Sequence, residues 1–143
     1  MSSGVPRVRR ATRNDAEAVA DFIASERPDW VQYRDWITTR DPDGILALVV
    51  ETDRICGLLY ASVISEPQLS PCRILAVHHV IVREGERSLP LLRRLMSEAK
   101  SWGREQGADT TTLLFESAGP KEERLARMLG FPVRGGTLFV GTL

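Results

Sequence analysis

Two adjacent histidines, His78 and His79, lie inside the apolar run RILAVHHVIV and are the only histidines of the chain. An imidazole has an ordinary pKa of about 6.5, so it can remove a proton from an ammonium group at neutral pH, directly or through water. Because side chains alternate along a strand, we expect only one of the two to face a given pocket. The alternative is a pair of structural histidines, hydrogen-bonded inside a central strand.

A charged loop and the start of a helix follow these histidines in the stretch VIVREGERSLPLLRRLM, which runs from Val80 to Met96. A strand, a turn and a helix N-terminus form a ready site for phosphate, because free amides and the helix dipole point at the anion. Such turns usually carry glycines, which let the backbone approach the anion closely. Here the glycines expected at the helix start are missing. Glu84, in the loop, is a weaker candidate for proton transfer than the histidines.

The elements that must position these residues follow from the spacing of apolar residues and from turn signals. Seven segments predict strands, at residues 5–11, 45–50, 55–65, 73–82, 109–117, 131–133 and 136–143. Four segments predict helices: one after Thr12 that ends near Ser25, one from about Asp29, one over 89–106 and one over 122–129. Thr12 and Asp15 have the spacing of a capping box at the first helix.

This order of elements, β-α-α-β-β-β-α-β-α-β-β, predicts the α/β (α+β) class. We expect one domain over residues 1–143, with a mixed, mostly antiparallel central sheet of six to seven strands and about four helices on both faces. The strand 73–82 is apolar on both alternating faces, which is typical of a central strand covered on both sides.

Composition narrows the class of protein. The chain has 143 residues, 43% of them hydrophobic, which is enough for one core. Its 19 basic and 19 acidic residues give a formal net charge of zero, which argues against a nucleic-acid binder that works by overall charge. No apolar run is long enough to span a membrane, and the first ten residues lack the apolar segment of a secretory signal. We therefore expect a cytoplasmic protein that binds neither nucleic acid nor a membrane.

The two cysteines, Cys56 and Cys72, each lie in an apolar run. No C-x-x-C motif or cluster of cysteine and histidine accompanies them. The expectation is two buried free thiols and no metal site.

The order of elements resembles that of the GNAT superfamily of acyl-CoA N-acyltransferases over nearly the whole chain. VRRATRND is similar to the opening strand and first helix cap of that family, and LAVHHVIV to its central fourth strand. LLRRLMSEAKSWGREQGADTTTL is similar to its third helix and fifth strand, and RLARMLGF to its ending. The resemblance implies acetyl-CoA as the cofactor and an amine as the acceptor.

The resemblance also places a cofactor motif, R-x-x-G-x-G/A, at Arg87, but Pro90 and Leu92 replace the two small residues. Proline has no N–H to donate, and Leu92 is expected to crowd the phosphates. Gly85, in the loop, is the candidate for a remodelled turn. Eight residues are implied in cofactor binding: Val80, Val82, Arg87, Ser88, Leu89, Leu91, Leu92 and Arg93. We expect weak or absent binding of acetyl-CoA.

The catalytic and acceptor positions of the family are altered as well. Its glutamates before the strand valine correspond to His78 and His79, and its tyrosine acid corresponds to Ala126. The loss of the acid is tolerable, because a thiol with a pKa of about 8.5 leaves largely as thiolate. Trp30, Tyr33 and Trp36 lie where the family builds its acceptor pocket, although their helical spacing also suits core packing.

Two functions remain in competition. The first is an N-acetyltransferase, in which an amine of a small molecule or protein attacks acetyl-CoA directly and a histidine takes the proton. The second is a non-catalytic binding or structural module of the same fold, and a sensor that binds acyl-CoA without transfer lies between them. The acceptor, the acyl group and assembly as a homodimer or larger complex are left open.

Overall fold

The computed structural model describes residues 5–28, 45–65, 73–114, 120–131, 133–135 and 138–142. The expected second helix lies outside these residues, together with its aromatic cluster Trp30, Tyr33 and Trp36. Cys72 lies outside them too, whereas Cys56 is a buried free thiol, as predicted.

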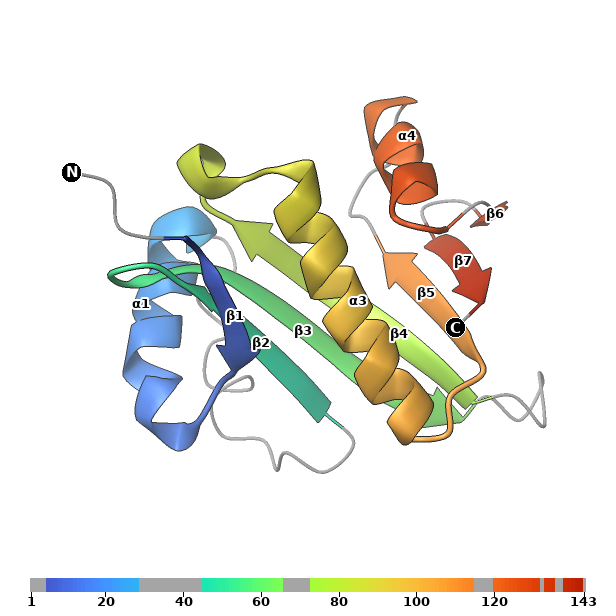
Figure 1. The fold of residues 1–143 in the computed structure, drawn as a ribbon, viewed down its shortest axis with the longest axis horizontal. Helices are drawn as coiled ribbons and strands as arrows, with labels where there is room; N and C mark the ends of the chain where they lie inside the picture. Colours follow the sequence, from blue (N-terminus) through green and yellow to red (C-terminus); the bar gives the residue numbers. More distant parts are fainter. Residues whose placement is uncertain are drawn as a thin grey trace.

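Seven strands form one sheet in the order β1-β2-β3-β4-β5-β7-β6 (Figure 1). They are β1 (Arg7–Arg10), β2 (Ile45–Glu51), β3 (Ile55–Ser65), β4 (Arg73–Val82), β5 (Thr110–Leu114), β6 (Val133–Gly135) and β7 (Leu138–Thr142). Every pair is antiparallel except β4–β5, which is parallel. The predicted mixed, mostly antiparallel sheet is therefore confirmed, and so is the central position of β4.

Helices cover both faces of this sheet. The described helices are α1 (Ala16–Glu26), α3 (Leu89–Glu105) and α4 (Pro120–Met128), with short 3-10 helices at Arg13–Asp15 and Glu84–Glu86. A large core joins one face of the sheet to α3 and the end of α4, and a smaller core joins the other face to α1. None of the helices in the described part is long and apolar enough to cross a membrane.

The start of α1 is held by an ion-pair network. The Asp15 carboxylate accepts the Thr12 N–H at 2.7 Å and both Arg9 guanidinium nitrogens at 2.8 Å. Arg9 also contacts Glu51, which in turn pairs with Arg7. Asp15 therefore does more than close the predicted capping box, since it ties β1 and β2 to the helix. The Arg9 hydrogen bond, the largest influence, lowers the pKa of Asp15.

Gly130, at the end of α4, meets two demands that only glycine satisfies well. Its φ of +93° lies in the left-handed region, and a Cβ there would lie 2.7 Å from Nζ of Lys100. That ammonium group donates to the carbonyl of Leu129 and lies 4.9 Å from the ring centre of Phe131. Lys100 thus joins α3 to the C-terminal end of α4.

Candidate active site

Strand β4 separates from β5 halfway along its length. The parallel pairing runs from Ile74↔Thr110 to Val77↔Leu113, and the described part of β5 ends at Leu114. On its other side β4 stays paired with β3 as far as Val82. Figure 1 shows β4 and β5 diverging toward their C-terminal ends. The predicted splay is confirmed over the described residues, and none of the described strands pairs with the β5-facing edge of residues 78–82, which we call the open edge.

The amides of Val80 and Val82 point to this open edge. The Arg83 N–H donates to the carbonyl of Cys56 in β3 at 2.8 Å, so the alternation of the backbone turns the N–H groups of Val82 and Val80 the other way. The Val82 carbonyl confirms this direction, because it accepts a hydrogen bond from Arg87 Nη2 at 3.3 Å. Val80 and Val82, two of the implied cofactor residues, therefore present their backbone N–H groups at this edge.

The start of α3 lies next in the chain and has few donors to spare. Ser88 is the N-cap, and its Oγ accepts the Leu91 N–H at 3.3 Å. The Leu92 N–H donates to the Ser88 carbonyl, and Pro90 has no N–H. The Leu89 amide is therefore the one backbone donor of the first turn that these contacts leave for an anion.

The side chains of Leu91 and Leu92 face the core of the protein. Both are buried in the core under α3, where they pack with Leu95 and Val82. The expectation that Leu92 crowds the phosphates was wrong, because the helix turns this position toward the sheet rather than toward solvent. Of the two replaced motif positions, Pro90 is the exposed one at the helix start.

The loop before α3 is not a glycine-built turn. Gly85 has an ordinary φ, and nothing lies within 4 Å of the Cβ that could be added there. The idea of a turn remodelled around Gly85 therefore has no support in its geometry. Glu84 opens the 3-10 helix beyond the end of β4 and is exposed, away from the histidine pair.

A β-bulge puts both histidines on one face of the sheet. Tyr60 of β3 lies opposite His79, but Ala61 lies opposite Val77, so His78 is the extra residue of β4. Leu75 and Val77 on one side of the bulge, and Val82 on the other, all face α3. Both imidazoles therefore point to the α1 face, and the expectation of one histidine per face was wrong.

The two imidazoles gather around Tyr60 on that face. The ring centres of His78 and His79 lie 6.0 and 6.4 Å from that of Tyr60 and 6.4 Å from each other. Nε2 of His78 lies 2.7 Å from the Ser62 hydroxyl, and burial lowers the pKa of His78. Tyr60 and Ser62 were not singled out from the sequence. Their two-residue spacing in β3 indicates that they share a face of the sheet. The bulge that brings His78 to them has no signal in the sequence.

A basic groove runs between α3 and the end of α4, with a volume of about 330 Å³. Arg93, Lys100 and Arg104 line it from one face of α3, with Met128 and Leu129 opposite. Of the described residues that line it, none is acidic. Lys100 is already engaged with Leu129, so the two arginines are the cations best placed to meet an anionic ligand. Arg93, one of the implied cofactor residues, belongs to this groove.

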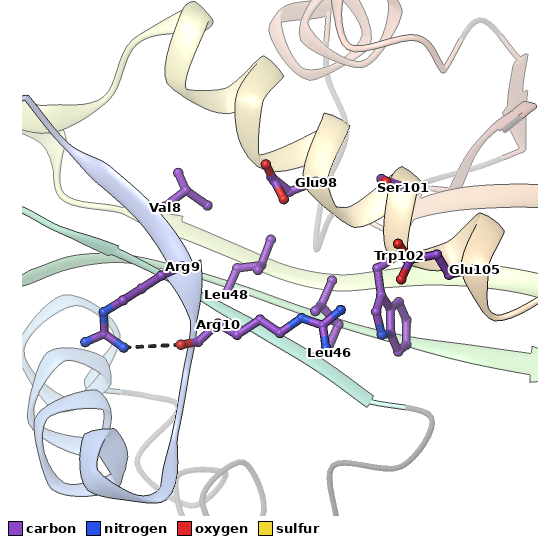
Figure 2. A pocket seen from close by; sticks show the side chains of 9 residues that line it. All are labelled: Val8, Arg9, Arg10, Leu46, Leu48, Glu98, Ser101, Trp102 and Glu105. Atoms are coloured by element: carbon purple, nitrogen blue, oxygen red, sulfur yellow. Dashed lines mark hydrogen bonds between the residues drawn. The ribbon is translucent and has the colours of Figure 1, made fainter.

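A second, smaller hollow of about 90 Å³ lies between β1 and α3 (Figure 2). Leu46, Leu48 and Trp102 form its apolar floor, and Arg10 reaches across it below Glu98. None of its lining residues comes from β4 or β5. It is therefore separate from the open edge of β4.

The fold is shared with known N-acetyltransferases of low sequence identity. The PaiA N-acetyltransferase from Thermoplasma acidophilum, solved with coenzyme A, matches 98% of this chain and 100% of its own, with a TM-score of 0.77 at 12% identity. The aminoglycoside antibiotic 6'-N-acetyltransferase from Acinetobacter baumannii matches over 92% and 93%, with a TM-score of 0.73 at 13% identity. The glucosamine-6-phosphate N-acetyltransferase from Arabidopsis thaliana matches over 92% and 95%, with a TM-score of 0.71 at 10% identity.

No curated protein matches this chain in sequence. A family model does, over residues 10–131, which cover the open strand edge, the histidine pair and the start of α3. This match spans most of the chain and agrees with the order of its strands. The chain belongs to the acetyltransferase (GNAT) family.

Proposed function

We propose that this chain is an acyl-CoA-dependent N-acetyltransferase that acts on a primary amine and binds its cofactor through a reduced set of backbone donors. The observation that carries the proposal is the open edge of β4, where the amides of Val80 and Val82 lie beside the start of α3. The pantetheine arm of CoA carries amides of its own and can pair with this edge as an added strand. The same edge brings the thioester carbonyl to a backbone N–H, which stabilises the developing oxyanion.

The pyrophosphate of CoA would then be bound by side chains more than by backbone amides. Pro90 and Ser88 between them remove two of the donors at the helix start, while Arg87 lies beside it and Arg93 follows one turn later. Arginine binds phosphate through two N–H groups at once, so it can replace part of what the glycine turn supplies. The basic groove between α3 and α4 continues this path and suits the remaining phosphate of the cofactor.

The chemistry needs only one proton acceptor. The amine nitrogen attacks the thioester carbonyl, an imidazole on the α1 face of β4 removes the proton, and the thiol leaves as thiolate. The tyrosine acid of the family is replaced by Ala126, a fully buried residue of α4. A thiolate is a stable enough leaving group that this loss slows the reaction without stopping it.

A second candidate, the non-catalytic module, is favoured by one observation. The hydroxyl of Ser88 already occupies the Leu91 amide and Pro90 has no N–H, so the first turn keeps only the Leu89 amide for the anion that acetyl-CoA would bring. In that case the open edge of β4 would bind a peptide or another chain. The two candidates differ in whether acetyl-CoA binds at all.

Calorimetry with acetyl-CoA, CoA and dephospho-CoA separates them. The enzyme is expected to bind all three, with dephospho-CoA weaker because it lacks one phosphate for the basic groove. Thiol release is then followed with a panel of amines that includes an aminoglycoside and a glucosamine phosphate, the acceptors named for structural relatives. Binding without thiol release from any amine would support the sensor, and absence of binding would support the non-catalytic module.

A further inference from the structure

Ser62 and His78 form a close pair of side chains on the α1 face of the sheet. Oγ of Ser62 lies 2.7 Å from Nε2 of His78. Enzymes that use covalent catalysis join a nucleophile to its base over about 2.6–3.2 Å, so this distance suits a serine nucleophile and an imidazole base. The bulge in β4 creates the pair, because Ser62 lies opposite Ala76 and the extra residue His78 follows on the same face.

The His78 imidazole can act as a base at neutral pH. Burial lowers the pKa of its ring, so the ring is mostly uncharged at pH 7 and one of its nitrogens carries a lone pair. When the Ser62 hydroxyl donates to Nε2, this lone pair meets the hydroxyl proton and the proton of the ring lies on Nδ1. A base-activated serine requires this direction of the hydrogen bond.

Solvent reaches both members of the pair. Ser62 and His78 are half-buried, whereas the neighbouring residues Tyr60 and Ala61 are fully buried. A serine nucleophile needs both conditions, since burial keeps its base unprotonated and partial exposure admits a substrate. Partial exposure suits a small acyl group better than a large one.

We propose that Ser62 and His78 form a nucleophile–base pair that transfers a small acyl group from an activated ester or thioester to water. This hydrolase activity goes beyond the proposed N-acetyltransferase. It does not rest on that proposal, because it needs neither CoA at the open edge of β4 nor an amine acceptor.

The reaction balances without any other reagent than water. Oγ of Ser62 bonds to the acyl carbon while Nε2 of His78 takes the hydroxyl proton. The bond from that carbon to the leaving oxygen or sulfur breaks with its electron pair on the leaving atom, which takes the proton from His78. His78 then removes a proton from water, whose oxygen attacks the acyl-serine, and returns it to Oγ as the ester bond breaks. One ester and one water give one carboxylic acid and one alcohol or thiol.

A fluorophosphonate probe tests the nucleophile, because its adduct with serine is stable and does not depend on release of the acyl group. We expect peptide mapping to find the adduct on Ser62 and to lose it in Ser62→Ala. His78→Gln should slow the labelling by about 10²–10⁴-fold, the usual contribution of a general base. No adduct on Ser62, or equal rates with and without His78, would overturn the proposal and show that the hydrogen bond is structural only.

Hydrolysis of p-nitrophenyl acetate tests turnover without CoA. Ser62→Ala and His78→Gln should both lower the rate at least about tenfold, whereas Ser101→Ala, an exposed serine on α3, is the matched control and should keep it. An unchanged rate in Ser62→Ala would overturn the proposal. Either result leaves the acetyltransferase proposal intact, since binding of acetyl-CoA and thiol release test that separately.

Ser62→Cys gives a second measurement in case Ser62→Ala does not keep its circular dichroism spectrum. A neighbouring imidazole lowers the pKa of a thiol, so the thiol of Ser62→Cys should react with iodoacetamide at pH 6 at least about tenfold faster than that of Ser62→Cys/His78→Gln. Peptide mapping separates this thiol from Cys56 and Cys72. Equal rates in the two variants would show that His78 does not activate this position, and the proposal would be wrong.

Discussion

The N-termini of the two long helices, α1 and α3, carry side chains of opposite charge. At the start of α1, the Asp15 carboxylate accepts the Thr12 amide and the Arg9 guanidinium, and Glu17 adds a second acidic residue in the first turn. The first turn of α3 has no acidic residue, and Arg87 precedes it. Because a helix N-terminus attracts negative charge, the short 3-10 helix that leads into α1 has an internal anion, whereas α3 has none in its first turn.

The comparison also shows where α3 is weak. Ser88 caps the Leu91 amide of α3 at 3.3 Å, and Pro90 stiffens its first turn. These two residues stabilise the helix at the expense of donors for a ligand. The start of α3 thus has the positive charge of an anion site, but its own cap takes up part of the hydrogen bonding that an anion would need.

Removal of Arg87 is expected to have the largest effect on this site. Its guanidinium lies at the open edge of β4, bonded to the Val82 carbonyl and close to the helix start. A hydrogen bond to a charged group contributes about 1.5–3 kcal/mol, so Arg87→Ala should weaken acetyl-CoA binding about 10- to 150-fold. Calorimetry measures the change.

Arg10→Ala is the matched control for that measurement. Arg10 is an exposed arginine on β1, in the hollow that is separate from the open edge. It should leave the affinity for acetyl-CoA unchanged. Equal losses in the two variants would mean that only the overall charge of the protein attracts the cofactor.

Returning the lost donors should strengthen binding. Ser88→Gly frees the Leu91 amide, and Pro90→Gly restores an N–H, while neither position contributes to the core. Glycine at the N-cap costs only a few tenths of a kcal/mol, so the double variant should still fold. We expect about a tenfold gain in affinity for acetyl-CoA, the value of roughly one added hydrogen bond to a charged group.

Leu92 is not part of this test. Replacing it with glycine would leave a cavity under α3 and cost about 2–5 kcal/mol, so a failure to bind would report unfolding. If Ser88→Gly/Pro90→Gly keeps its circular dichroism spectrum and its affinity does not rise, the start of α3 is not the anion site.

Much of the fold was predictable because apolar periodicity is strong in this chain. Leu91, Leu92, Leu95 and Met96 recur at helical spacing, and the helix over 89–106 was placed within a residue of its true end. The same periodicity already placed Leu92 on the buried face, but the motif resemblance assigned it to the cofactor. Where the two disagreed, the physical pattern was correct.

The candidate site was less predictable, since it depends on a departure from regular geometry. The bulge at His78 changes which face each following residue of β4 occupies, and no turn residue or glycine marks it in the sequence. The bond between Ser62 and His78 depends on that bulge. The strand itself can therefore be predicted from its composition. A site that depends on a bulge in that strand can be located only from the observed strand pairing.

The contacts of the Asp15 carboxylate with Arg9 and Thr12 predict how stability depends on pH. The Arg9 hydrogen bond lowers the pKa of Asp15 in the folded protein, so its charged form stabilises the fold at neutral pH. This contribution is lost as the pH falls below the ordinary aspartate value of about 3.9 and through the folded pKa. Asp15→Asn should therefore reduce the free energy of unfolding by about 1 kcal/mol at pH 7, a value reduced by partial exposure of Arg9, and by progressively less under acid conditions.

Urea unfolding at several pH values measures this difference. Asp21→Asn is the matched control, since Asp21 is exposed on the same helix, and it should change stability by less than about 0.5 kcal/mol at any pH. A deficit in Asp15→Asn that stays constant down to pH 2 would show that the network stabilises the fold through packing and not through charge.

The smallest effect is expected at Gly85, in the loop that leads to α3. Its φ is ordinary and the space around its Cβ is empty, so Gly85→Ala should change the free energy of unfolding by less than about 0.5 kcal/mol and leave acetyl-CoA affinity unchanged. Gly130→Ala is the contrast, because the positive φ of +93° opposes a side chain there, at a cost of about 1–3 kcal/mol. Thermal unfolding measures the stability of the two variants, and calorimetry measures their affinity for acetyl-CoA. A clear loss of cofactor affinity in Gly85→Ala, with stability intact, would mean that the loop backbone itself approaches the pyrophosphate. The proposal that arginine side chains replace backbone amides in binding the pyrophosphate would then be wrong.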